Sequence, residues 1–216
     1  VCMNGQNLLQ DLETTLQRTV RIQNDANCFA LSEAMDGAAA NYKMVFGVII
    51  GTGTGAGLVF NKQLITGPHA IAGEWGHNFL PWTQDYDVSR DCYCGKQNCI
   101  ETFLSGPGMA ANAKALTNNS LSSRQIVEKA QQGDESCAEQ LDHYYDQMAR
   151  GLAMIINIID PDAIVLGGGM SNINGIYEAV PARLGKYVFS DFVETKLLPP
   201  RFGDSSGVRG AAWLWS

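Results

Sequence analysis

Four side chains that commonly bind metal ions lie close together in one segment of the chain. Cys92, Cys94 and Cys99 fall within eight residues, and His77 precedes the first of them by fifteen residues. Three thiolates and one imidazole complete a tetrahedral ligand set for zinc, and a set with no open position is structural. The spacing therefore predicts a structural zinc ion bound by these four residues.

The same segment carries two carboxylates, Glu74 shortly before His77 and Glu101 directly after the last cysteine. Isolated acids on loops are usually solvated, and an isolated histidine is more often hydrogen bonded than a ligand. An ion that fixes this loop would, however, also fix both carboxylates, which suits a polyhydroxylated ligand. Alternatives for the fourth metal ligand are His69, Asp91 and Cys137, and a thiol cluster without metal is the remaining interpretation.

Composition narrows the class of protein. With 216 residues, of which 45% are hydrophobic and 17% charged, the chain can form one large domain or two small ones around a buried core. A net charge of −7 argues against binding to nucleic acid, and no run of 18 apolar residues predicts a membrane span.

The cysteine content indicates a reducing compartment. Six cysteines are sparse for a disulfide framework in a chain of this length, and the first residues do not form a signal peptide, so we expect reduced thiols and a cytoplasmic protein. Cys2, Cys28 and Cys137 stand among apolar residues and are predicted to be small core residues.

Hydrophobic periodicity predicts an α/β protein with a mixed sheet. Helices are expected at 8–16, 26–41, 108–116, 122–132, 135–159, 175–189 and 208–215. Strands are expected at 20–22, 44–50, 56–60, 63–66, 163–166 and 194–198. The long irregular stretch 68–105 is of the kind that is usually functional or held by a ligand.

Asn24 and Asp25 stand where a predicted strand gives way to a helix. Either residue could cap the helix by accepting hydrogen bonds from its first amides. Asp25 could instead act as a catalytic carboxylate that takes a proton from a hydroxyl group. The two interpretations are compatible if Asn24 caps the helix and Asp25 reacts.

Two glycine-rich stretches follow buried strands. Residues 51–57 read Gly-Thr-Gly-Thr-Gly-Ala-Gly, and a strand comes next, so they are not a dinucleotide fingerprint. They form either a tight hairpin or a turn whose amides and Thr hydroxyls face a phosphate. Gly167, Gly168 and Gly169 either allow close strand–helix packing or lie against a nucleotide.

Together these motifs resemble the ROK family (repressor, open reading frame, kinase) of sugar kinases along essentially the whole chain. The motifs, in order, are Asn-Asp-Ala-Asn at 24–27, the glycine-rich turn at 51–57, Ala-Gly-Glu-Trp-Gly-His at 72–77, the cysteine segment at 92–101 and Asp-Pro-Asp with three glycines at 160–169. The wording of residues 74–77 and 203–210 is most similar to the bacterial fructokinase (manno/fructokinase) branch, followed by N-acetylglucosamine kinases.

The resemblance implies an actin-like, ribonuclease-H-like ATPase fold and ATP-dependent phosphorylation of a hexose, most simply D-fructose to fructose 6-phosphate. Asp25 would be the general base, with Mg²⁺ accompanying ATP and with a homodimer as the assembly. Sugar contacts would come from Asn24, Glu74, His77 and Glu101. ATP contacts would come from Gly51, Thr52, Gly53, Thr54, Gly167, Gly168 and Gly169.

The chain departs from the family pattern at its start. The family's Asp-Gly-Gly-Thr-Lys type of phosphate loop is absent, so residues 1–41 are interpreted as a remnant of the N-terminal lobe. Residues 42–216 would be the C-terminal lobe, including a zinc loop at 68–105. Alternatives to a fructokinase are an N-acetylglucosamine kinase, a sugar-sensing repressor of the same family, and a catalytically incomplete part of the kinase.

Overall fold

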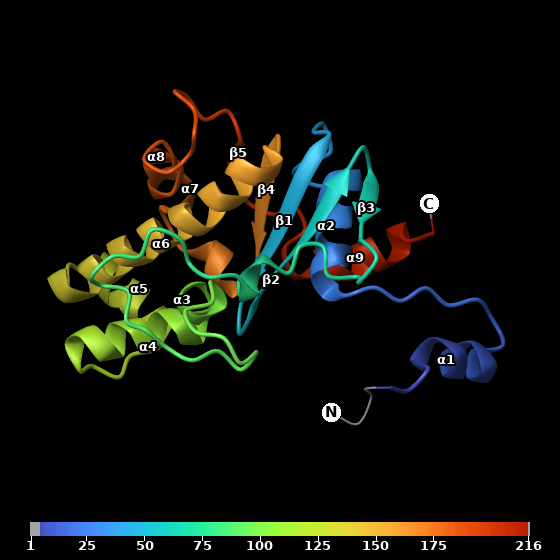
Figure 1. The fold of residues 1–216 in the computed structure, drawn as a ribbon, viewed down its shortest axis with the longest axis horizontal. Coiled ribbons are helices and arrows are strands. Elements are labelled where there is room, and N and C mark those ends of the chain that lie inside the picture. The colour runs from blue at the N-terminus through green and yellow to red at the C-terminus, as the bar shows by residue number, and fades with distance from the viewer. Residues whose placement is uncertain (1–4, 216) are drawn as a thin grey trace.

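The computed structural model describes residues 5–215, and a five-stranded mixed sheet lies at the centre of this part of the chain (Figure 1). The sheet order is β3-β2-β1-β4-β5, with β1, β2 and β3 antiparallel and β4 and β5 parallel to β1. The strands are β1 (Met44–Ile50), β2 (Thr54–Phe60), β3 (Gln63–Ile65), β4 (Ala163–Gly167) and β5 (Lys196–Leu198). The predicted mixed sheet is confirmed.

Helices cover both faces of the sheet (Figure 1). One face packs against α2 (Asp25–Met35) and α9 (Ser206–Trp213), and the other against α3 (Glu101–Leu104), α4 (Gly106–Thr117) and α6 (Glu135–Ile159). Neighbours on β1 therefore join different cores: Val45 belongs to the cluster that contains Phe29 of α2, and Phe46 belongs to the cluster that contains Trp75 and Leu152. Burial on both faces explains the unbroken apolar run of this strand.

The remaining helices are short or peripheral. They are α1 (Leu8–Leu16), α5 (Ser123–Gln131), α7 (Ile176–Ala179), α8 (Pro181–Leu184), and the 3₁₀ turns η1 (Trp75–His77), η2 (Gly169–Asn172) and η3 (Gly203–Ser205). Helix α1 buries no side chain and stands apart from the sheet at the end of an extended linker (Figure 1). Helix α2, in contrast, packs on the sheet with the elements that follow it, and the division after residue 41 stays a proposal.

Three sequence predictions of helices and strands were wrong, and for the two helices the structure shows the reason. Residues 20–22 are extended but pair with no strand within the described chain. The helix expected at 175–189 is two single turns, because Pro181 has no amide hydrogen to continue the first. The helix expected at 26–41 ends at Met35, where the buried Glu33 carboxylate accepts a hydrogen bond from the amide of Ala38 at 2.8 Å.

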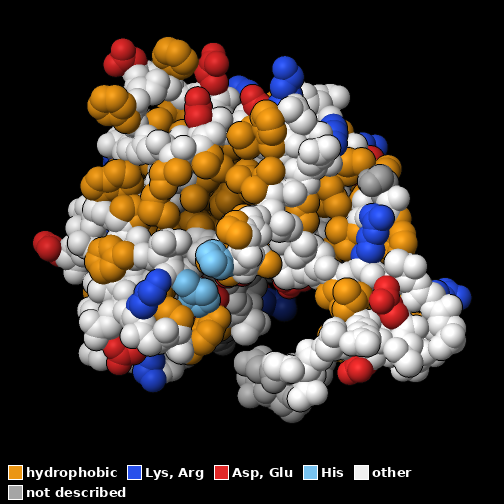
Figure 2. Space-filling model, turned by 45° about the vertical axis from the view of Figure 1, so that its right-hand side comes forward, with side chains coloured by type: hydrophobic (Ala, Val, Ile, Leu, Met, Phe, Trp, Pro, Cys, Tyr) orange, Lys and Arg blue, Asp and Glu red, His pale blue; other side chains and the backbone are white. Residues whose placement is uncertain are grey.

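The structure also places the remaining cysteines and the exposed hydrophobic side chains. Cys28 and Cys137 are buried as predicted, while Cys2 lies outside the described residues. Hydrophobic side chains gather over a broad area of one face that carries few charges (Figure 2). Among residues 5–215, every helix is too short or too polar to cross a bilayer.

Candidate active site and metal centre

Two short backbone pairings bring His77 to the cysteines. Residues 78–80 pair with 98–100, with Leu80 N–H donating to Asn98 O at 2.9 Å and Ile100 N–H donating to Asn78 O at 2.8 Å. Residues 91–97 form a tight turn that is closed by a hydrogen bond of 2.8 Å from Cys92 N–H to Lys96 O. Gly95 takes a positive φ of 86° in this turn, which a glycine adopts without strain.

The four predicted ligand residues come together. One donor atom from each of His77, Cys92, Cys94 and Cys99 lies within 4.8 Å of all the others. Cys94 Sγ lies 3.6 Å from Cys99 Sγ, and Cys92 Sγ lies 3.6 Å from His77 Nδ1. In a tetrahedral zinc site two sulfurs are about 3.8 Å apart, and a sulfur and a nitrogen about 3.6 Å apart. The donor set therefore fits zinc in both chemistry and spacing.

Burial keeps one of the thiols protonated in the absence of a cation. Burial, followed by the hydrogen bonds that its thiol donates to Cys94 and Cys92, raises the pKa of Cys99 to about 12. Without a positive charge nearby, this buried sulfur would keep its proton, whereas a bound metal ion favours the thiolate. The alternative ligands do not join the cluster of four: His69 is exposed, Asp91 accepts a hydrogen bond from Gln97, and Cys137 is buried on α6.

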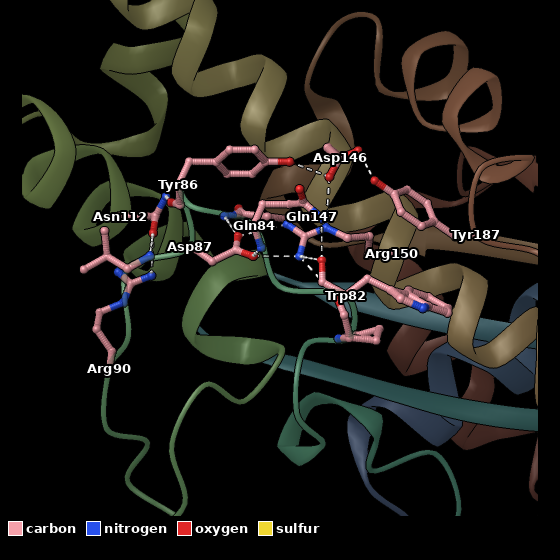
Figure 3. Close-up of polar contacts among 12 residues, drawn as sticks. Trp82, Gln84, Tyr86, Asp87, Arg90, Asn112, Asp146, Gln147, Arg150 and Tyr187 are labelled. Atoms are coloured by element: carbon pink, nitrogen blue, oxygen red, sulfur yellow. Dashed lines mark hydrogen bonds and ion pairs between the residues drawn. The ribbon is translucent and has the colours of Figure 1, made fainter.

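A buried ion-pair network holds the same segment to α6 at a second point (Figure 3). The fully buried Arg150 binds Asp87 through two hydrogen bonds, of 2.7 and 2.9 Å, and Asp146 through a third of 2.9 Å. Tyr86 and Tyr187 donate to Asp146 at 2.6 and 2.7 Å. Burial alone would raise the pKa of Asp146. These hydrogen bonds and the Arg150 charge outweigh burial and lower that pKa. The network keeps a charged pair satisfied in the interior.

Two glycines let the start of the segment lie against the sheet. A Cβ added to Gly73 would lie 2.2 Å from the carbonyl oxygen of Ala56, and one added to Gly76 would lie 2.2 Å from that of Thr54. Both oxygens belong to the backbone of β2, which cannot move aside cheaply. The glycines on either side of Glu74 and Trp75 therefore allow the close approach that places Glu74 beside the first residues of β2.

A polar cavity of about 420 Å³ lies where these elements meet. Its lining brings together Asp25, Glu74, His77 and Glu101, four residues singled out from sequence. The β1–β2 turn forms another wall. The complete lining is Asp25, Ala26, Ile49, Gly51, Thr52, Gly53, Thr54, Gly55, Glu74, His77, Tyr93 and Glu101. Carboxylates that converge on a small pocket can accept hydrogen bonds from several hydroxyl groups.

Asn24 and Asp25 differ in their positions: the first caps a helix and the second lines the polar cavity. Asn24 caps α2, with its side-chain oxygen accepting from the amide of Asn27 at 2.7 Å, and it does not line the polar cavity. Asp25 is exposed, lines the cavity and accepts from the amide of Ala26 at 2.8 Å. Within residues 5–215 the second carboxylate oxygen of Asp25 has no such bond and is available to a hydroxyl in the cavity.

Glu101 has a structural task that the sequence did not reveal. Its Oε2 accepts a hydrogen bond of 2.8 Å from the amide of the buried Thr54, at the start of β2. The same oxygen lies against Gly53, where an added Cβ would come within 2.8 Å of it. Glu101 therefore joins residues 68–105, the metal segment, to the β1–β2 turn, and it also lines the cavity.

A larger and mainly apolar cavity of about 810 Å³ lies on the other side of the β1–β2 turn. Gly51 and Thr52 line both cavities, so the turn lies between them. The amide of Gly106, at the start of α4, donates to Gly51 O at 2.9 Å and places a helix N-terminus beside the turn. The complete lining is Gly51, Thr52, Gly106, Pro107, Ala110, Ser122, Ser123, Arg124, Val127, Glu128, Gly169, Met170, Asn172 and Ile173.

The glycines predicted to contact ATP occupy different positions. Gly53 and Thr54 line the polar cavity alone, and Gly169 lines the apolar one. Gly167 and Gly168 line neither: an added Cβ would lie 2.5 Å from the ring of Phe29 at the first and 2.4 Å from the carbonyl oxygen of Ile50 at the second. Close packing accounts for these two positions.

Sequence comparison identifies the family. A model of the ROK family matches residues 2–216. The chain belongs to the ROK family. It is 41% identical to the N-acetyl-D-glucosamine kinase of Escherichia coli O139:H28, over 98% of this chain and 71% of that protein. It is 40% identical to the N-acetyl-D-glucosamine kinase of Pasteurella multocida, over 96% of this chain and 70% of that protein.

Solved structures of ROK proteins share the fold. The ROK hexokinase of Thermus thermophilus superposes with a TM-score of 0.84 at 28% identity, over 95% of this chain and 67% of that one. A ROK glucokinase of Streptomyces griseus, solved with glucose and AMPPNP, gives 0.81 at 25% identity, over 96% of this chain and 71% of that one. The expected actin-like ATPase fold is confirmed.

The link between Glu101 and Thr54 predicts a difference between two substitutions. Glu101→Ala removes the acceptor and leaves a buried amide unpaired, which should lower the free energy of unfolding by about 1–3 kcal/mol. Glu101→Gln retains an acceptor oxygen and should cost less. Urea unfolding and amide hydrogen exchange at Thr54 measure both effects. Equal protection of the Thr54 amide in the Ala variant and the parent would contradict this role.

Proposed function

We propose that this protein is an ATP-dependent hexose kinase whose sugar binds in the polar cavity and whose nucleotide binds in the apolar cavity. The observation that carries the proposal is the β1–β2 turn, because Gly51 and Thr52 line both cavities. A phosphoryl group passing from nucleotide to sugar would cross at this turn. Relatives that are kinases of N-acetyl-D-glucosamine, and a related structure solved with glucose and AMPPNP, support this assignment.

N-acetyl-D-glucosamine is the preferred substrate in this proposal. The curated relatives at 40–41% identity carry that activity in their names. The comparisons give no support to the fructose preference expected from residues 74–77 and 203–210. A similarity to a ROK transcriptional regulator, at 23% identity and a TM-score of 0.80, extends to the fold alone.

The residues of the polar cavity have distinct roles in the proposed reaction. Asp25 accepts the proton of the attacking sugar hydroxyl as the new bond to phosphorus forms. Glu74 and Glu101 accept hydrogen bonds from other sugar hydroxyls and orient the ring, and orientation supplies much of the catalysis in phosphoryl transfer. The contact between Asn24 and the sugar remains a prediction, and since Oδ1 caps the helix, the side-chain amide group would have to make it.

Other groups around the two cavities suit the phosphates and the purine base of ATP. Amides of the β1–β2 turn and of the N-terminus of α4, a helix of 12 residues, can face the phosphates. The apolar wall, which includes Ala110, Met170 and Ile173, suits the flat face of a purine. Mg²⁺ accompanies ATP in this scheme and neutralises phosphate charge.

A structural zinc ion and a homodimer complete the proposal. His77, Cys92, Cys94 and Cys99 would hold the ion, which would stabilise the loop and supply no open coordination position. The homodimer stays a prediction. The broad apolar area of Figure 2 is a surface of the kind that forms subunit contacts.

A substrate panel with an Asp25 variant tests the proposed function. With ATP, kcat/KM should be highest for N-acetyl-D-glucosamine when compared with glucose, mannose and fructose in a coupled ADP assay. Asp25→Asn should lower kcat by about 10²–10⁴-fold and leave the sugar Kd nearly unchanged, because it removes the proton acceptor only.

Asp204→Asn makes the same change at an exposed carboxylate outside both cavities and serves as the control. Lack of turnover with all four sugars would contradict a hexose kinase. A fructose kcat/KM above that of N-acetyl-D-glucosamine would contradict the preference alone.

Neighbouring alanines on α4 test the nucleotide cavity. Ala110 lines the cavity, whereas Ala111 is exposed. Ala110→Trp should raise the KM for ATP at least about tenfold by filling the space, with the sugar Kd unchanged. Ala111→Trp adds the same side chain on the solvent side and should leave both constants near their parent values. Identical ATP kinetics for the two variants would place the nucleotide elsewhere.

A further inference from the structure

Both nitrogens of the His77 ring are engaged before any sugar arrives. Nδ1 faces the thiol cluster, 3.6 Å from Cys92 Sγ. Nε2, on the other side of the ring, lies 2.9 Å from the hydroxyl oxygen of Tyr93. The nitrogen that is turned away from Cys92 is therefore already paired with a tyrosine.

The direction of this hydrogen bond follows from the donor set. A ring nitrogen that binds a metal ion carries no proton, so a neutral His77 held through Nδ1 has its proton on Nε2. Nε2–H then donates to the oxygen of Tyr93. The hydroxyl hydrogen of Tyr93 is left over, and the structure gives that hydroxyl no second partner among the described residues.

Tyr93 is also placed where a ligand would meet it. It lines the polar cavity with Asp25, Glu74 and Glu101, yet its side chain is 83% exposed. Its ring meets the His77 ring edge-on, with centroids 5.1 Å apart and planes at 89°. An exposed tyrosine at a pocket wall offers an apolar ring and a polar hydroxyl that a ligand can contact.

Apart from the β1–β2 turn, whose amides are assigned to the phosphates, the cavity lining contains few groups that donate hydrogen bonds. A carboxylate accepts hydrogen bonds and donates none, and three carboxylates line the cavity. Sugar oxygens are acceptors as well as donors, and an acceptor left unpaired on binding costs affinity. The free hydroxyl hydrogen of Tyr93 can satisfy one of these oxygens.

We propose that Tyr93 contacts the hexose directly, donating its hydroxyl hydrogen to a sugar oxygen while His77 Nε2 orients the phenol from behind. This inference rests on the proposed function and adds a contact through Tyr93 to those expected from Glu74, His77 and Glu101. It makes Tyr93 a sugar-affinity residue that lies between two of the cysteines without being a metal ligand.

Tyr93→Phe tests the proposal because it removes one oxygen atom and keeps the ring. The Kd for N-acetyl-D-glucosamine, measured by calorimetry without ATP, should rise about three- to tenfold, the effect of losing one neutral hydrogen bond. The sugar KM should rise in parallel, with kcat within about twofold and the ATP KM unchanged, because the lost contact is uniform binding. Metal content should equal that of the parent.

Tyr42→Phe makes the same chemical change at a partly buried tyrosine that packs in the α2 core, outside both cavities, and should leave the sugar Kd unchanged. An unchanged Kd in Tyr93→Phe would overturn the proposal. A lower Kd would also overturn it, by showing that the phenol competes with the sugar for His77. If the parent protein binds none of the four hexoses, the proposed function fails first, and this inference fails with it.

Discussion

The convergence of His77 with three cysteines is the constraint on which the rest of the site depends. Residues 68–105 contain almost no regular structure, and ordering such a stretch carries a large entropic cost. Four donor atoms within 4.8 Å of one another, spaced as zinc requires, provide one point of attachment. The buried Arg150 network provides a second, on α6. Between these two points the chain has little freedom to rearrange.

The fixed segment shapes the chemistry through Glu101, which follows the last cysteine. Its carboxylate lines the polar cavity and also holds the amide of Thr54, so the metal segment and the β1–β2 turn share one side chain. That turn separates the two cavities, and its residues Gly51 and Thr52 line both of them. A change in the metal cluster should therefore alter both the proposed binding of the sugar and the position of the turn that would face the transferred phosphate.

Local sequence patterns predicted much of the fold. Helix α6 and the buried strands follow from periodicity, and the metal ligands follow from spacing. The apolar cavity proposed for the nucleotide could not be predicted in the same way, since its lining combines residues near 51, 106, 124 and 170 that meet only in the folded chain. Tyr93 was missed as a cavity residue because it reads as a spacer between two cysteines. The close approach of Phe29 to Gly167 could not be predicted either, and contact of this glycine with ATP stays a prediction. The preference between hexoses depends on a few contacts and is not encoded in motifs that family members share.

X-ray absorption at the zinc edge, on the protein purified without added metal, tests the central claim most directly. About one zinc per chain is predicted, with three sulfur neighbours at about 2.3 Å and one nitrogen at about 2.0–2.1 Å. Substitution of Cys94 by Ser, at the exposed position of the cluster, should remove one sulfur from that shell. A protein that binds sugar fully without metal, or a zinc surrounded by oxygen and nitrogen alone, would contradict the account.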